Sequence, residues 1–169
     1  MKGLGPQMQA VLIQLPPSFK NNPVNLARVE AMGKYLPKGG PTMVFEFRDS
    51  SWFVPAVYNL MRKYKLTLGG TAIRRPTKRY WLGDLPTGIH IPPRTSNATY
   101  IRIHGAKGYR GYYDKKQLAA IRRGVKSRGT SKNFVMFNNT FFDSRSRSCT
   151  VKNKKIRYAA VCDAVEFAT

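Results

Sequence analysis

Acidic residues and histidine are scarce in this sequence. Its 169 residues include 8 aspartates and glutamates and 2 histidines, against 30 lysines and arginines. Zinc and multi-metal centres gather several acidic and imidazole ligands at close spacing, and no such spacing occurs here. We therefore expect neither a metal nor a cofactor.

Cysteine and long apolar runs are equally scarce. The 2 cysteines, Cys149 and Cys162, form no closely spaced pair, and no signal peptide is recognisable. This usage is typical of reduced thiols in an intracellular protein, either cytoplasmic or nuclear. Because no apolar run approaches the length of a membrane span, we expect no membrane partner.

Positive charge is what the chain has in excess. Its net charge is +22, and between Arg102 and Arg157 sixteen lysines and arginines stand against only Asp114 and Asp143. A field of this size attracts polyanions, and nucleic acid is the first partner to consider. The alternative is a solvated basic surface without such a partner. With 42% apolar residues, the composition favours one folded domain over residues 1–169.

Two stretches of the sequence, residues 43–48 and 99–105, alternate apolar and polar side chains. In an extended strand this period of two sends the two sets to opposite faces. The charged or titratable side chains on the polar faces are Glu46, Arg48, Arg102 and His104. An unpaired buried charge is costly, so we expect Arg48 or Arg102 to pair with Glu46.

Strand and helix patterns alternate along the chain. Strands are predicted at residues 10–15, 43–48, 66–72, 99–105 and 133–139. Helices are predicted after Asn22, after the polar turn 49–52, after Asp114, and over about residues 156–167. The glycines of the third strand indicate a close backbone approach, and residues 73–97 resemble a basic, proline-bearing loop. The alternation is typical of an α/β fold with parallel strands and crossover helices.

Five short motifs occur in order along the chain. They are LGP at 4–6, QLPPSF at 14–19, EFR at 46–48 with SW at 51–52, YIRIHG at 100–105, and FNNT at 137–140. Together they resemble the YecE-like family, also called domain of unknown function 72, a TIM-barrel group. The resemblance implies a partial TIM barrel of about five parallel strands alternating with helices, lacking the family's first three strands. It also implies a single incomplete domain with a basic insert at about 143–155, and a second chain or fragment that completes the barrel.

The resemblance also places a candidate site, because the carboxyl ends of the strands form the active face of a TIM barrel. On that face we expect His104 and Glu46 as catalytic residues, with His104 as a general acid or base and Glu46 orienting it or acting itself. The expected ligand- and anion-binding residues are Arg48, Arg102, Gln14, Asn138, Asn139 and Tyr109. The alternative is a structural network of Glu46 with the arginines.

These observations predict a TIM-barrel-type protein that binds a phosphate-bearing ligand, nucleic acid first of all, at the carboxyl ends of its strands. The loop tyrosines Tyr109, Tyr112 and Tyr113 are expected to stack bases beside basic side chains. If the site is catalytic, its residues favour metal-independent acid–base chemistry on a phosphate-containing substrate. The alternative is a non-enzymatic basic scaffold that binds nucleic acid.

Overall fold

The computed structural model describes residues 7–73, 88–105, 111–138, 149–151, 154–156 and 159–168. Two of the expected site residues, Asn139 and Tyr109, lie outside the described residues. Most of the expected basic insert at 143–155 also lies outside them. The other expected site residues all fall inside the described ranges.

Parallel strands form the centre of the fold. β1 (Ala10–Gln14), β2 (Thr42–Glu46) and β3 (Thr67–Leu68) pair in that order, and β4 (Gly70–Ile73), β6 (Ala98–Ile103) and β7 (Lys132–Phe137) pair in that order. Only Gly69 separates β3 from β4, and its backbone N–H donates to the Phe45 carbonyl at 2.8 Å. The extended segment 67–73 therefore joins the two sets of strands.

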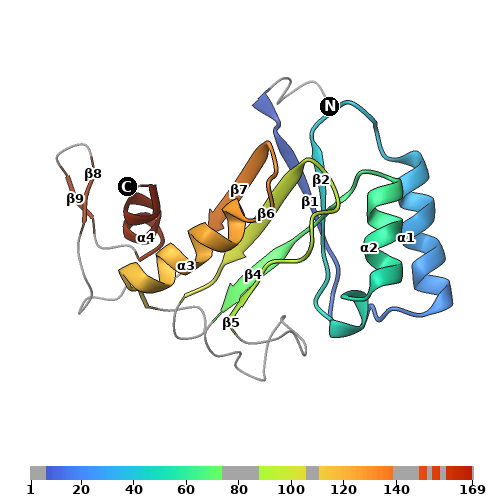
Figure 1. The fold of residues 1–169 in the computed structure, drawn as a ribbon, viewed down its shortest axis with the longest axis horizontal. Coiled ribbons are helices and arrows are strands. Elements are labelled where there is room, and N and C mark those ends of the chain that lie inside the picture. The colour runs from blue at the N-terminus through green and yellow to red at the C-terminus, as the bar shows by residue number, and fades with distance from the viewer. Residues whose placement is uncertain are drawn as a thin grey trace.

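Helices connect most of the parallel strands. α1 (Pro23–Tyr35) follows β1, α2 (Pro55–Lys63) follows β2, α3 (Lys115–Lys126) follows β6, and α4 (Ala159–Ala168) ends the described chain. The predicted caps are present, since the side chain of Asn22 accepts from the Asn25 N–H at 2.9 Å and that of Asp114 from the Gln117 N–H at 2.8 Å. Figure 1 shows α1 and α2 side by side, and α3 and α4 on the β7 side. None of the described helices has the length and apolar character that crossing a membrane requires.

Two apolar cores lie between the strands and the helices. In the first, Phe45 and Phe47 pack against α1, α2 and Trp52, and the Phe47 and Trp52 rings stack with 4.1 Å between centroids. In the second, Ile101 and Ile103 of β6 pack with the buried side chains of α3. In both cores the apolar set of an alternating strand faces the helices. The polar set therefore faces the other surface of the sheet.

Several features of the fold were not predicted. The segment 73–97, expected to be a loop, contains β5 (Gly88–His90), which pairs antiparallel with β4. β8 (Cys149–Val151) and β9 (Lys154–Ile156) form an antiparallel pair, so the last helix begins at Ala159 rather than near 156. Cys162 is disulfide-bonded, and the expectation of a reduced thiol is wrong at this residue. Strand partners and oxidation state depend on distant parts of the chain, which local patterns do not report.

Candidate functional site

Polar side chains of several strands share the face that is turned away from the helices. The parallel register pairs Gln14 with Glu46 and Thr71 with Arg102, so the members of each pair point to the same side. His104 directly follows β6 and continues the alternation that starts with Arg102. The carboxyl ends of β1, β2 and β6 thus bring these side chains to one end of the face.

Glu46 holds two arginines at the centre of this group. Its carboxylate is completely buried, forms an ion pair with Arg48 Nη2, and lies 3.0 Å from Arg102 Nη1. Gln14 Oε1 accepts from the same two guanidiniums, at 2.8 Å from Arg102 Nη1 and 3.3 Å from Arg48 Nη2. The sequence predicted one arginine as the partner of Glu46, and the structure uses both. Two guanidiniums and one carboxylate leave one surplus positive charge.

The two arginines differ in their access to solvent. The side chain of Arg48 is 2% exposed, whereas that of Arg102 is 17% exposed. The side chain of Arg102 forms its hydrogen bonds and its ion pair with other described residues through Nη1. Its Nε and Nη2 donors are therefore available to a ligand at the surface of the network.

His104 is buried beside the arginines and is 1% exposed. Its backbone N–H donates to the Ala72 carbonyl at 2.9 Å, and its own carbonyl accepts from the Tyr113 hydroxyl. Burial, followed by the charges of Arg48 and Arg102, lowers the pKa of His104 to about 3. The imidazole is therefore neutral at pH 7. It lacks the second ring proton of an imidazolium, which a histidine general acid would donate at that pH.

Tyr113 supports His104 from the helix side of the sheet. Its side chain is buried, and its hydroxyl contacts the carbonyl oxygens of His104 and, at 3.1 Å, Ala72. Its backbone N–H donates to the Asp163 carboxylate at 3.2 Å. Burial, followed by the Asp163 charge, raises the pKa of the Tyr113 phenol. The prediction that Tyr113 stacks bases is therefore wrong, because its ring belongs to the apolar core with α3.

One residue of the segment 67–73 contributes to this face without having been predicted as a site residue. Thr71 is 2% exposed, and within the described part of the chain its Oγ1 has no hydrogen-bond partner. A Cβ atom at Gly70 would lie 2.6 Å from the His90 carbonyl oxygen, so the backbone of β5 approaches this position too closely for a side chain. The close backbone approach predicted from the glycines is confirmed. Thr71 carries no local signal, because the pairing of β4 with β6 places it beside Arg102.

Asn138 lies at the same end of the sheet as His104. Its backbone N–H donates to the Ile103 carbonyl at 2.8 Å, and the residue is half-buried. Among the described residues, no group of three or more histidines, cysteines and acidic residues is placed to hold a metal ion. The expected site residues that the structure gathers at this end are Gln14, Glu46, Arg48, Arg102, His104 and Asn138.

Solved structures that resemble this fold include two DUF72 family proteins. A DUF72 family protein from Thermotoga maritima MSB8 has a TM-score of 0.68 and 24% identity, over 95% of this chain and 56% of that chain. A DUF72 family protein from Enterococcus faecalis V583 has a TM-score of 0.67 and 18% identity, over 94% of this chain and 59% of that chain. The chain therefore spans less than two thirds of the length of these relatives. Among curated proteins, no match is found.

The sequence itself carries the family assignment. The family model described as "Protein of unknown function DUF72" matches residues 1–166, which is nearly the whole chain. This range includes the candidate site residues from Gln14 to Asn138. The resemblance to the YecE-like family, inferred from five short motifs, is thereby confirmed. The chain belongs to the DUF72 family of proteins of unknown function.

Proposed function

We propose that the face at the carboxyl ends of the strands binds a phosphate-bearing ligand, with nucleic acid as the ligand class. The partly exposed guanidinium of Arg102 carries this proposal. Glu46 and Gln14 fix its Nη1, while its other donors are not engaged by described residues. A guanidinium held in one orientation presents paired donors whose geometry fits phosphate oxygens.

The charge of the site favours an anion. Glu46 neutralises Arg48 in a buried pair, so the surplus positive charge of the network is carried to the surface by Arg102. The whole chain has a net charge of +22, which favours a phosphate polymer over a neutral or cationic ligand. The local and the overall charge thus support the same class of ligand.

The proposed roles of the remaining residues follow from their contacts. Gln14 orients Arg102, Asn138 supplies an amide at the mouth, and the buried, neutral His104 packs beside the arginines. Glu46 is completely buried with its oxygens 3.0 and 3.4 Å from Arg102 Nη1, so we assign it a positioning role. Binding fits this arrangement better than metal-independent acid–base chemistry, which needs a group that exchanges protons near neutral pH.

A binding measurement with Arg102→Gln tests the proposal. The matched control is Arg123→Gln, which removes the same charge from an exposed position on α3. We expect Arg102→Gln to weaken binding of a labelled single-stranded oligonucleotide about tenfold or more, because it removes charge-assisted hydrogen bonds. Arg123→Gln should change the affinity much less. Equal losses in the two variants, measured by fluorescence anisotropy at the same salt concentration, would contradict a specific site.

The second candidate function is a non-enzymatic scaffold that binds nucleic acid through its general surface charge. It is favoured by the distribution of charge, since the site holds one surplus positive charge and the chain has +22. In this case the affinity falls steeply with added salt, yet Arg102→Gln and Arg123→Gln behave alike. The same pair of variants therefore separates the two functions.

We also propose that the curved set of parallel strands is a partial TIM barrel that another chain or fragment completes. Its support is the pairing of the strands, because β1 and β7 each have one strand partner among the described residues. A closed barrel has no free strand edges, whereas exposed edges invite pairing with another chain.

A further inference from the structure

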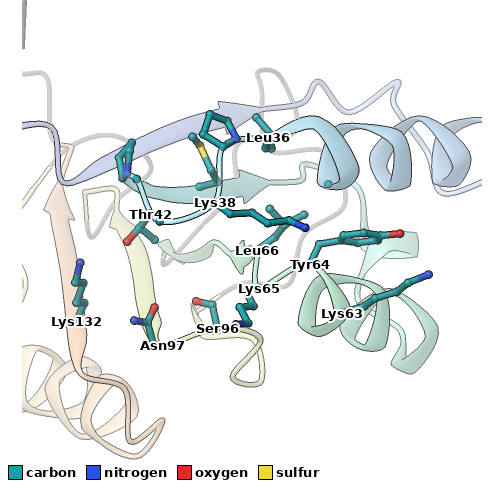
Figure 2. Close-up of a pocket in the computed structure, with 16 residues that line it drawn as sticks. Leu36, Lys38, Thr42, Lys63, Tyr64, Lys65, Leu66, Ser96, Asn97 and Lys132 are labelled. Atoms are coloured by element: carbon teal, nitrogen blue, oxygen red, sulfur yellow. The ribbon is translucent and has the colours of Figure 1, made fainter. Parts of the chain in front are cut away.

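A hollow lies at the opposite end of the strands from Arg102 and His104. It is a cleft of about 690 Å³, and it is lined by residues that start or precede strands. Thr42 opens β2, Leu66 precedes β3, Asn97 precedes β6, and Lys132 opens β7. Figure 2 shows these residues around one opening. The cleft is therefore at the amino ends of the strands, and it shares no lining residue with the candidate site.

Four lysines and no acidic residue line this cleft. They are Lys38, Lys63, Lys65 and Lys132. Lys63 is paired, because its Nζ lies 3.0 Å from Glu30 Oε1. Lys38, Lys65 and Lys132 are exposed and have no ion pair with any described residue. Three uncompensated positive charges thus come from separate parts of the chain to the same opening.

The backbone at Lys65 is unusual for a lysine. Its φ is +55°, in the left-handed region, and it is the only residue other than glycine with a positive φ in the described part of the chain. Its N–H donates to the Arg62 carbonyl at 3.1 Å, and the Leu66 N–H donates to the Met61 carbonyl at 2.9 Å. These two bonds form the Schellman motif, in which glycine is the usual residue at this position. A lysine stands here although glycine suits the backbone better.

Helix stability alone does not explain these lysines. Basic residues near helix C-termini interact favourably with the helix dipole, and Lys38 and Lys65 follow α1 and α2. Lys132, however, opens a strand. A dipole interaction at an exposed position is also weaker than the penalty of the left-handed region for a residue with a side chain. The positive charge of Lys65 therefore has an explanation other than helix stability.

The extent of the cleft indicates a ligand with repeated negative charges. Its lining crosses the strand ends from β2 through β3 and β6 to β7, and at about 4.8 Å per neighbouring strand this is about 14 Å. Lysines spread over that distance can contact separate phosphates of one polymer. A nucleic-acid strand carries one charge per about 3.4 Å of axis, so several of its phosphates fit along the cleft.

We propose that this lysine cleft binds the phosphate backbone of a single strand of nucleic acid. A groove of this kind follows one strand, with lysines contacting successive phosphates and the side-chain amide of Asn97 as a further donor. The cleft is independent of Arg102. A loss of binding on substitution here does not depend on the site at the other end of the strands.

The test is the triple variant Lys38→Gln, Lys65→Gly and Lys132→Gln in a chain that already carries Arg102→Gln, so that binding at the other end of the strands does not mask the result. Binding of a labelled single-stranded oligonucleotide is measured over a range of salt concentrations. We expect a loss of affinity of more than tenfold at moderate salt. The slope of log K against log salt should fall by about two, because three phosphate contacts to a single strand are removed. Lys63→Gln should have a smaller effect, since Glu30 already neutralises that charge. The matched control is Lys116→Gln with Arg122→Gln and Arg123→Gln on α3, which removes the same number of charges elsewhere.

Folding is checked with Lys65→Gly alone. We expect this variant to unfold at the same temperature as the unmodified chain or a higher one, since glycine suits the left-handed backbone, and yet to bind the oligonucleotide more weakly. The α3 control should keep most of the affinity. Equal losses in the cleft variant and the α3 variant, an unchanged salt slope, or no binding by the unmodified chain would each overturn the proposal.

Discussion

Arg102 Nη1 lies 2.8 Å from Gln14 Oε1, although Arg102 is on β6 and Gln14 is on β1. β2 and the segment 67–73 lie between those two strands. In a flat sheet with about 4.8 Å between neighbours, β1 and β6 would be about 14 Å apart. The contact is possible because the face is concave and both side chains reach inward. Since Arg102 also contacts Glu46 on β2, the network supports the fold as well as forming the candidate site.

Replacing Glu46 by glutamine should be strongly destabilising. The substitution leaves the guanidinium of Arg48, which is 2% exposed, without its neutralising carboxylate. Removing one partner of a buried ion pair typically costs about 3 kcal/mol or more. The free energy of unfolding in urea measures this loss. Glu30→Gln is the control, because that glutamate pairs with Lys63 at the surface, and its loss should be much smaller. Similar losses for the two variants would show that the buried pair is not a main support of the fold.

Tyr113→Phe should destabilise the fold by about 1–2 kcal/mol, because it removes the hydroxyl that contacts the buried carbonyl oxygens of His104 and Ala72. The ring remains in the core with α3, so little apolar packing is lost. Tyr35→Phe removes the same atom from a side chain that is 87% exposed and should be neutral. Urea unfolding of both variants provides the comparison. If Tyr113→Phe is also neutral, the hydroxyl does not hold the end of β6 in place.

The depressed pKa of His104 predicts a stability that falls with acidification. A histidine in the unfolded chain takes up its proton near pH 6.5, whereas His104 in the folded protein does so near a pKa of about 3. Between these values the unfolded state binds more protons, so the free energy of unfolding falls as the pH drops below 6.5. At about 1.4 kcal/mol per pH unit, His104 lowers the free energy of unfolding by about 2 kcal/mol at pH 5.

His104→Gln should remove that contribution and flatten the curve of unfolding free energy against pH between 6.5 and 5. Burial and Arg128 lower the pKa of His90 as well, but His90 is present in both proteins and its effect cancels in the comparison. Urea unfolding at several pH values measures both curves. Parallel curves would mean that His104 is not buried in its neutral form.

Local patterns predicted the parts of the fold that local chemistry determines. Asn22 and Asp114 mark helix starts because their side chains satisfy backbone donors that have no partner within the helix. The alternation over 99–105 predicted that Arg102 and His104 share a face opposite the apolar core. Both signals lie within a few residues of the feature they specify.

The rest of the site depends on contacts between distant segments. Thr71 reaches the face only because β4 pairs with β6, and the pairing register cannot be derived from the glycines beside it. The neutral state of His104 results from burial and from two arginines, one just after β2 and one on β6. The lysine cleft has no motif, because Lys38, Lys65 and Lys132 meet only when the amino ends of the strands are aligned. The sequence therefore predicted the network around Glu46, but neither the neutral state of His104 nor the lysine cleft.

The concave face also carries apolar side chains that should drive association with a second chain. Leu12 on β1 is 36% exposed and Met136 on β7 is 47% exposed. Met136 is in register with Arg102, and Leu12 precedes Gln14 by one strand period, so both belong to the concave face. Because β1 and β7 are the outer strands of the described parallel sets, their edges and these side chains present one surface to a partner.

We therefore expect the purified chain to have a solution mass above the 19.1 kDa of a single copy, as measured by light scattering after size exclusion. Leu12→Lys with Met136→Lys should shift it towards that mass, since two charges would have to be buried in the contact. Val24→Lys, at a position on α1 that is 62% exposed, is the matched control and should leave the mass unchanged. A single-copy mass for the unmodified chain would instead mean that the concave face is stable in water without a second chain. The exposed leucine and methionine would then be ordinary surface residues rather than an interface.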